Sequence, residues 1–230
     1  MISSAPRTTA DSTTIAMLLA DARLPSGAHA HSAGMEPALA GGMAVADVPA
    51  FLIGRARTTS LVEAGAAVVA RHLALEGGDT RPVERAWAAR TPAPAMRDAA
   101  VNLGRGLLRL ASRVWPESDA LRQAAARPAA PPRAVVAGMV AAVAGLRADD
   151  LVRLIVYDEA HSAAAAVLKL APRDPVDPIG WVLEACAAVE HLVPVLAELT
   201  LPDAIPALGA PQAEGWAQAH AVLSQRLFRA

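Results

Sequence analysis

Residues 47–78 read DVPAFLIGRARTTSLVEAGAAVVARHLALEGG, and this stretch decides the fold class. Asp47 followed by Pro49 is typical of a helix start, and the pair Gly77 and Gly78 is typical of a helix end. Between them apolar side chains recur every three to four residues, at Phe51, Leu52, Leu61, Ala64, Val68 and Leu73. The pattern predicts a single helix of about eight turns.

The rest of the chain carries the same kind of signal. Pro and Gly separate further predicted helices at residues 11–22, 31–39, 81–90, 95–114, 132–145, 148–170, 178–199 and 210–227. No segment alternates with period two, no heptad pattern is sustained and no repeat of fixed period occurs. We therefore predict an all-α, single-domain bundle of roughly eight to ten helices over residues 12–230, after a disordered tail at 1–11. The Ala- and Pro-rich stretch 124–132 is interpreted as a linker between two halves or a loop within one domain.

Composition narrows the function classes. The 230 residues are 54% hydrophobic, 19% charged and 3% aromatic, with 21 Lys and Arg against 22 Asp and Glu. A formal net charge of -1 leaves no basic excess for a general nucleic-acid binder. The single cysteine, Cys186, excludes an intramolecular disulfide framework and a zinc site built from several thiolates.

Targeting signals are not evident in the sequence. Residues 1–14 contain no apolar core of a secretory signal. The longest uncharged apolar run, between Arg133 and Arg147, has 13 residues, whereas a membrane-spanning helix needs about 20. We expect a cytoplasmic protein that does not associate with membranes.

Two short motifs resemble nucleotide-binding sequences but lack their context. Asp158-Glu159-Ala160-His161 matches a helicase ATPase string, yet it lies in a helical pattern and the chain has no Gly-Lys-Ser/Thr. We interpret it as a polar patch in which Asp158 and His161 can meet at a spacing of three. Gly104-Arg105-Gly106 follows a helical stretch rather than a strand, which favours a close helix approach or a helix break over a dinucleotide loop.

No spacing assembles a catalytic or metal centre. His29 and His31 could offer two nitrogen ligands on one side of an extended segment, but two ligands do not complete a site. The other histidines lie far away in sequence, and Cys186 with Glu190 and His191 reads as a buried structural thiol. The last predicted helix carries an apolar stripe for core packing or for docking a partner, formed by Trp216, His220, Leu223 and Leu227.

Several stretches, taken in order, carry a family resemblance. Residues 18–36, LLADARLPSGAHAHSAGME, resemble the N-terminal signature of the urease accessory protein UreF family, in its actinobacterial branch. Further similar stretches are TPAPA at 91–95, GRGLLRLA at 104–111, RVWP at 113–116, AVVAG at 134–138 and RLFR at 226–229. The resemblance covers most of the chain.

The resemblance implies an all-α homodimer that bridges the accessory protein UreD and the nickel-carrying GTPase UreG. That complex inserts nickel into apo-urease in a GTP-dependent reaction, so nickel and GTP act through partner proteins and this chain has no catalytic centre or cofactor. The family's partner-facing elements are the early loop and the C-terminal tail. They map here to Gly27, His31, Ser32, Gly34, Glu36, Arg226, Leu227 and Phe228.

This sequence departs from the family pattern at three places. His29 stands where the family often has an aromatic residue, and Lys169 replaces a family Arg. Arg173-Asp174-Pro175 replaces a Leu-Gly-Gln turn. The resemblance therefore implies no contact for this chain at that turn or at that Arg, and Lys does not replace Arg wherever a bidentate bond is used.

Two other functions are kept as alternatives. In the first, the chain is a helical nickel carrier in which His29 and His31 of two protomers meet across a symmetry axis. Stoichiometric nickel binding that is lost on His29→Ala would identify it. In the second, the chain is a small helical enzyme, although no nucleophile, base and orienting group can be assembled from these spacings.

Overall fold

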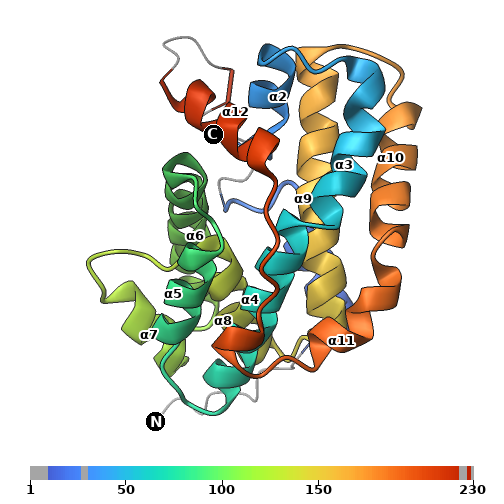
Figure 1. Ribbon diagram of the computed structural model, residues 1–230. Helices are drawn as coiled ribbons and strands as arrows, with labels where there is room; N and C mark the ends of the chain where they lie inside the picture. Colours follow the sequence, from blue (N-terminus) through green and yellow to red (C-terminus); the bar gives the residue numbers. More distant parts are fainter. Residues whose placement is uncertain (1–9, 27–30, 223–226, 229–230) are drawn as a thin grey trace.

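The computed structural model describes residues 10–26, 31–222 and 227–228 (Figure 1). Over these residues the regular secondary structure is helical and contains no strand, which confirms the all-α prediction. The described residues form twelve α-helices, the shortest of which, α11, has five residues. They are α1 (Ser12–Ala20), α2 (Met35–Ala40), α3 (Val48–Ala56), α4 (Thr59–Leu75), α5 (Arg81–Ala89), α6 (Pro94–Val114), α7 (Asp119–Ala125), α8 (Arg133–Ala144), α9 (Ala148–Leu170), α10 (Val176–Ala187), α11 (Val193–Ala197) and α12 (Pro211–Ala221). Asp11 caps α1 by accepting a hydrogen bond from the Thr14 backbone N–H at 3.0 Å, as its cap-type side chain predicts.

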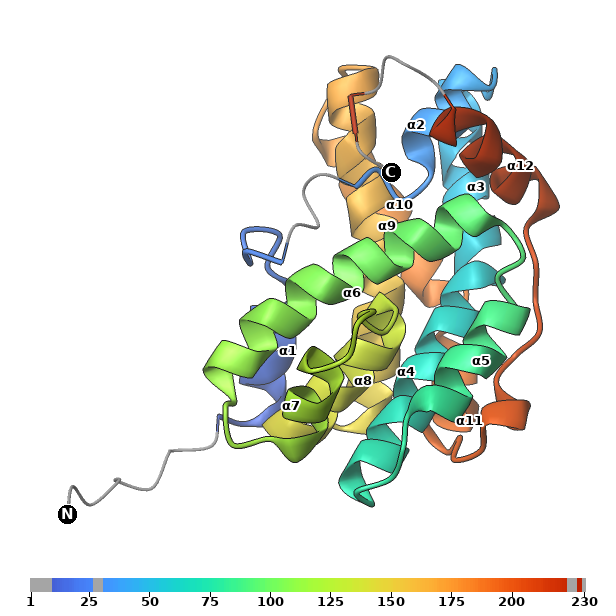
Figure 2. The same ribbon diagram turned by 90° about the vertical axis from the view of Figure 1, so that its left-hand side faces the viewer.

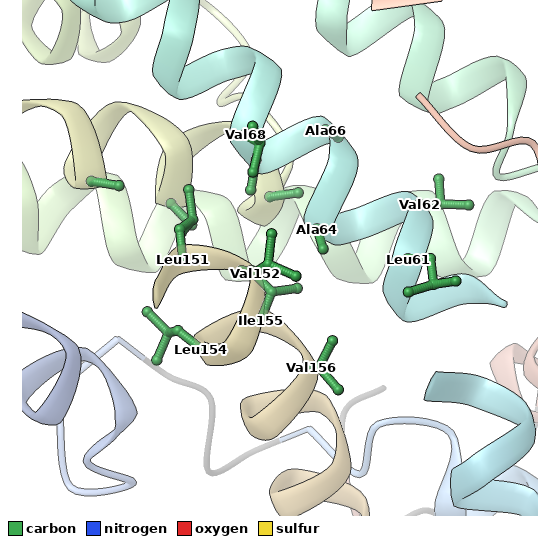
Figure 3. Close-up of a cluster of buried hydrophobic side chains, with 14 of the residues drawn as sticks. Leu61, Val62, Ala64, Ala66, Val68, Leu151, Val152, Leu154, Ile155 and Val156 are labelled. Carbon is green, nitrogen blue, oxygen red and sulfur yellow. The ribbon is translucent and has the colours of Figure 1, made fainter. Parts of the chain in front are cut away.

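The long helix α9 runs through the middle of the molecule, with α4 and α8 packed on one side and α10 on another (Figure 1). Figure 3 shows the core between α4 and α9. The buried side chains there are small or branched and include Leu61, Val62, Ala64, Ala66, Val68, Leu151, Val152, Leu154, Ile155 and Val156. Gly138 of α8 lies so close to α4 that an added Cβ would be 2.8 Å from the Ala70 Cβ and the Arg71 backbone nitrogen. Small residues therefore set the spacing of the central helices.

Helix α6 lies across the outside of α8 (Figure 2). Its two mid-helix glycines face other parts of the backbone: a Cβ at Gly104 would overlap the Pro131 carbonyl, and one at Gly106 would overlap the Ser26 carbonyl. The predicted close approach is confirmed, but the neighbours are loop segments rather than a second helix. The first two residues of stretch 124–132 form the end of α7, and the remainder is a short loop that connects α7 to α8. The start of α7 is capped by Ser118, whose Oγ accepts a hydrogen bond from the Leu121 backbone N–H.

The single helix predicted over residues 47–77 is wrong, because the chain breaks between α3 and α4. Thr58 lies outside helical geometry, with φ -127° and ψ -95°, and its hydroxyl donates to the Gly54 carbonyl at 2.8 Å. Such a back-bonded Thr bends or interrupts a helix. Apolar periodicity continues through the break because both helices face the same core.

The predicted helices near the C-terminus also differ from the structure. Helix α10 begins at Val176 and ends at Ala187, and a 310 turn at Glu190–Leu192 separates it from α11. Pro194 occupies the first turn of α11, where it disfavours continuation of a preceding helix. Helix α12 ends at Ala221, so the predicted stripe is cut short, and Leu223 lies outside the described residues.

One part of the described chain, Val176–Ala197, is long and apolar enough by length and composition to cross a membrane. The sequence prediction missed it because only uncharged runs were considered, and this segment contains Asp177, Glu184 and Glu190. In the structure it comprises α10, the 310 turn and α11, with 28% of its most apolar window buried. A single segment of this kind does not identify a membrane protein.

An extended strap, residues 198–210, connects α11 to α12 along the outside of α4 and α5 (Figure 1). Arg90 of α5 donates to two strap carbonyls, those of Ile205 at 2.9 Å and Asp203 at 3.1 Å. Gly65 of α4 leaves room for Pro206, whose Cδ would be 2.8 Å from an added Cβ. The strap thereby delivers α12 to α2 and α6, at the opposite end of the molecule from α11 (Figure 2).

Candidate functional site

The carboxylate of Glu36 joins the early loop to the C-terminal end of the chain. It accepts hydrogen bonds from the backbone N–H groups of Leu227, at 2.6 Å, and Phe228, at 2.9 Å. The His220 Nε2 of α12 lies 3.1 Å from the same carboxylate, although it is not aligned as a hydrogen-bond donor. We name Glu36, His220, Leu227 and Phe228 the C-terminal clasp.

The loop before α2 aims Glu36 at this position. Ser32 Oγ accepts from the Glu36 backbone N–H at 3.3 Å, and His31 Nδ1 accepts from the Ala33 N–H at 2.8 Å. Ala33 and Gly34 both have positive φ, 49° and 83°, so the chain turns sharply into α2. A Cβ on Gly34 would also be 2.9 Å from the Arg55 guanidinium, so glycine is needed there for two reasons.

The clasp holds its two terminal residues differently. The Phe228 side chain is 5% exposed, and the Lys169 Nζ lies 5.2 Å from the centre of its ring. The Leu227 side chain is 63% exposed and points away from the core. Lys169, one of the departures from the family pattern, therefore stabilises the buried end of the clasp, while Leu227 is left for contacts outside the chain.

Beneath the clasp lies a set of paired charges contributed by three helices, α3, α8 and α9. Arg55 of α3 pairs with Glu159 of α9, and Arg133 of α8 pairs with Asp158 of α9 at 2.8 Å. His161 instead stacks on Tyr157, with ring centres 5.3 Å apart. Burial raises the pKa of Asp158, and Arg133 and His161 both oppose this shift, so Asp158 and His161 lie near each other as predicted, although the ion pair of Asp158 is with Arg133.

Two further titratable groups adjoin these ion pairs. Desolvation raises the pKa of Glu63 to about 7, with the Glu159 charge adding to the effect, while its Oε1 accepts from Trp87 Nε1 at 2.6 Å. Desolvation lowers the pKa of His31 to about 4; Glu159 opposes this shift, and Arg55 and Arg133 add to it. At neutral pH His31 is therefore uncharged, which agrees with its Nδ1 accepting the Ala33 N–H.

Two cavities border the same charges. The larger, of about 310 Å³, lies under α12 and is lined by Glu63, Glu159 and His220. The smaller, of about 170 Å³, lies beside Phe228 and Lys169. His31 and Arg133 line both. The clasp therefore covers a polar interior, and any movement of α12 would expose it.

The structure brings most of the expected partner-facing residues to one end of the molecule. Glu36, Leu227 and Phe228 meet in the clasp, while Ser32 and Gly34 shape the loop beneath it, and His31 faces the interior. Gly27, His29 and Arg226 lie outside the described residues. Sequence reasoning missed Arg55, Arg133 and Glu63, whose partners are distant in sequence, and apolar periodicity gives no signal for such pairs. It noted Lys169 as a departure from the family pattern but not its contact with Phe228.

Metal binding gains no support from this geometry. Among the described residues no group of three or more His, Cys, Asp or Glu side chains is placed to hold a metal ion. The Nδ1 of His31 already accepts the Ala33 N–H. Cys186 is half-buried, and desolvation and Glu190 raise the pKa of its thiol. The raised pKa favours the protonated thiol, which is a poor metal ligand and a poor nucleophile.

Comparison with known proteins gives a consistent result. The family model UreF matches residues 43–185. A urease accessory protein UreF of Mycobacterium marinum is 44% identical over 171 residues, covering 72% of this chain and 77% of that protein. A Mycobacterium tuberculosis relative of the same name is 43% identical over 167 residues, which is 71% of this chain and 75% of the relative. A UreF of Mycolicibacterium vanbaalenii is 36% identical over 217 residues, or 92% and 96% of the two chains.

Proposed function

The chain belongs to the UreF family of urease accessory proteins, and from this premise we propose that it is a non-catalytic chaperone that bridges UreD and the GTPase UreG. In this role it supports GTP-dependent insertion of nickel into apo-urease. Nickel and GTP are handled by the partner proteins, and this chain holds neither. It works as a homodimer in the cytoplasm, so that each partner-facing surface is presented twice around a two-fold axis.

The observation that carries the proposal is the bond between Glu36 and the C-terminal end of the chain. A scaffold must present its contact residues in a fixed arrangement, because ordering them only on binding costs free energy. The clasp fixes two elements that are 191 residues apart in sequence by charge-assisted hydrogen bonds to one carboxylate. It also leaves Leu227 exposed at the surface of this end.

Reconstitution of the complex tests the proposal. The chain is co-expressed with UreD and UreG, and the mixture is separated by size-exclusion chromatography. We expect all three proteins to co-elute. Separate elution of the chain at every ratio of partners would contradict the bridging role.

Single substitutions then test the clasp as the contact region. Phe228→Ala removes the buried anchor and is expected to lower recovery of the complex at least about tenfold. Val222→Ala, at a side chain 84% exposed just after α12, is the matched control and is expected to have no effect. Circular dichroism must show equal helix content in both variants. Arg226→Ala, next to the clasp in sequence, is expected to behave like Phe228→Ala.

A nickel titration of the isolated chain separates the proposal from the carrier alternative. We expect no stoichiometric binding at micromolar nickel, because the described residues offer no three-ligand group. Tight binding that is lost in His29→Ala would contradict the proposal and establish the carrier.

A further inference from the structure

Helix α10 presents an apolar stripe that nothing in the described chain covers. Val176, Ile179 and Leu183 are 69%, 61% and 65% exposed, and exposed Ala187 continues the row. At 100° per residue these positions fall within an arc of about 80° on the helix surface. The opposite face of α10, which carries Val182 and Ala185, packs on α9 and α3 (Figure 1). Such a contiguous exposed stripe marks a contact surface.

Gly180, at the edge of this stripe on the side of the acidic residues, has no close neighbour inside the described chain. A helical Gly costs about 1 kcal/mol relative to Ala, so the position requires a reason. At Gly65, Gly104 and Gly138 the reason is a neighbour that an added Cβ would hit, whereas a Cβ at Gly180, as at Gly54 and Gly215, would meet nothing within 4 Å. Of these three glycines, Gly180 is the one that adjoins the exposed stripe. Between Ile179 and Leu183, a missing side chain allows another backbone to approach closely.

The charges beside the stripe indicate what kind of surface approaches. Asp177 and Glu184 line one flank of the stripe, and both are exposed. Residues 174–225 contain seven Asp and Glu but no Lys or Arg. Arg173, just before the helix, stacks on Trp181 with its guanidinium carbon 4.9 Å from the ring centre, and its Nε lies 3.5 Å from the Asp177 carboxylate. The surface is therefore apolar with an acidic rim.

Two occupants fit this surface poorly. A lipid bilayer surface attracts helices through Lys and Arg beside the apolar face, and this rim has the opposite charge. A second copy of this chain would bring the same acidic rim and no cation from residues 174–225 to neutralise it. A different protein with an apolar centre and a basic rim satisfies both the stripe and the rim.

We infer that the exposed face of α10 is a second docking surface of this scaffold, one that binds an apolar, basic-rimmed surface of a urease-maturation protein. This rests on the proposed function, because the partner is sought among UreD, UreG and apo-urease. The surface lies on the outer side of α10 and does not include any residue of the C-terminal clasp (Figure 1). A scaffold with two separate surfaces can hold two proteins at once.

Pull-down of tagged chain from co-expression with UreD, UreG and apo-urease tests the inference, using Leu183→Asp and Glu184→Lys. Leu75→Asp is the matched control, because Leu75 is 53% exposed at the end of α4. We expect both α10 variants to lose at least about tenfold in recovery of one partner while the control loses none. Recovery of the wild-type complex should also fall as salt rises.

The outcomes separate this inference from the proposed function. If wild type recovers its partners and both α10 variants recover all three equally well, the inference is overturned and the proposed function stands. If wild type recovers no partner, both are overturned. Light scattering that shows a dimer for wild type and a monomer for Leu183→Asp would assign the stripe to a second copy instead. Co-sedimentation of wild type, but not Leu183→Asp, with phosphatidylcholine and phosphatidylserine vesicles would assign it to a membrane.

Discussion

Replacing Glu36 by Gln should release the C-terminal end of the chain while leaving the helices in place. The Glu36 carboxylate accepts two backbone N–H groups at 2.6 and 2.9 Å, and its side chain is 12% exposed. A Gln amide can accept only one of these N–H groups, because its NH2 group faces the other one. Hydrogen bonds to a charged group contribute about 1.5–3 kcal/mol each.

We therefore expect the clasp to weaken by about 2–3 kcal/mol, which raises its open fraction about 30- to 150-fold. Hydrogen exchange measured by NMR gives this directly, since the amide protons of Leu227 and Phe228 are the groups bound to the carboxylate. Exchange of both should accelerate by that factor, while amides of α9 remain unchanged. In cells that co-express the urease operon, urease activation should fall in parallel.

Glu76→Gln is the matched control, because Glu76 lies at the exposed C-terminal end of α4 and makes no side-chain bond to a described residue. It should leave exchange at Leu227 and Phe228 as in wild type. Equal exchange of these two amides in wild type and Glu36→Gln would refute the reasoning. Accelerated exchange throughout the protein would refute it as well, because the effect would then be global unfolding.

Two further predictions concern the core and the interior charges. Gly138→Ala should lower the free energy of unfolding by about 1–3 kcal/mol, because its Cβ would press on Ala70 in α4. Gly54→Ala, with open space around the added Cβ, should raise the free energy of unfolding by about 0.5–1 kcal/mol. Urea titration followed by circular dichroism measures both changes, and equal effects would contradict the close approach of α8 to α4. The raised pKa of Glu63, about 7, makes folded protein bind a proton that unfolded protein releases, so this residue lowers stability as pH rises from about 4.5 to 7. The lowered pKa of His31, about 4, acts oppositely and lowers stability as pH falls from about 6.5 to 4. The two effects oppose each other in wild type, so Glu63→Gln should leave the effect of His31 alone and make the protein lose stability on acidification, by up to about 1.4 kcal/mol per pH unit. Midpoints of urea unfolding between pH 4.5 and 7 measure this loss. A pH profile parallel to that of wild type would contradict the opposing shifts.

Helix positions could be predicted from this sequence where one apolar face is buried and ordinary caps mark the ends. The predicted range 148–170 matches α9 to the residue, and the predicted range 11–22 matches α1 to within two residues at each end. The break at Thr58 could not be predicted, because both helices around it face one core and the periodicity passes through. The end of α10 was missed for the same reason, even though Pro194 lies a few residues further on.

The candidate site was predictable only in part. The likeness of residues 31–36 and 226–228 to a known family indicated two elements, but not that one carboxylate joins them. The pairs Arg55 with Glu159 and Arg133 with Asp158 span 104 and 25 residues, and no local pattern relates such positions. The polar string at Asp158 was therefore interpreted only as a polar patch on a helix, whereas tertiary packing places Asp158 and Glu159 in ion pairs with Arg133 and Arg55.

The strap of residues 198–210 makes closing of the clasp an intramolecular reaction. Arg90 and Gly65 fix its middle on α4 and α5, so α12 stays tethered near Glu36 even when the clasp is open. A short tether of this kind corresponds to an effective concentration of roughly millimolar. A protein that competes for the Glu36 carboxylate must therefore bind well below millimolar, whereas one that binds the closed clasp gains a site already assembled.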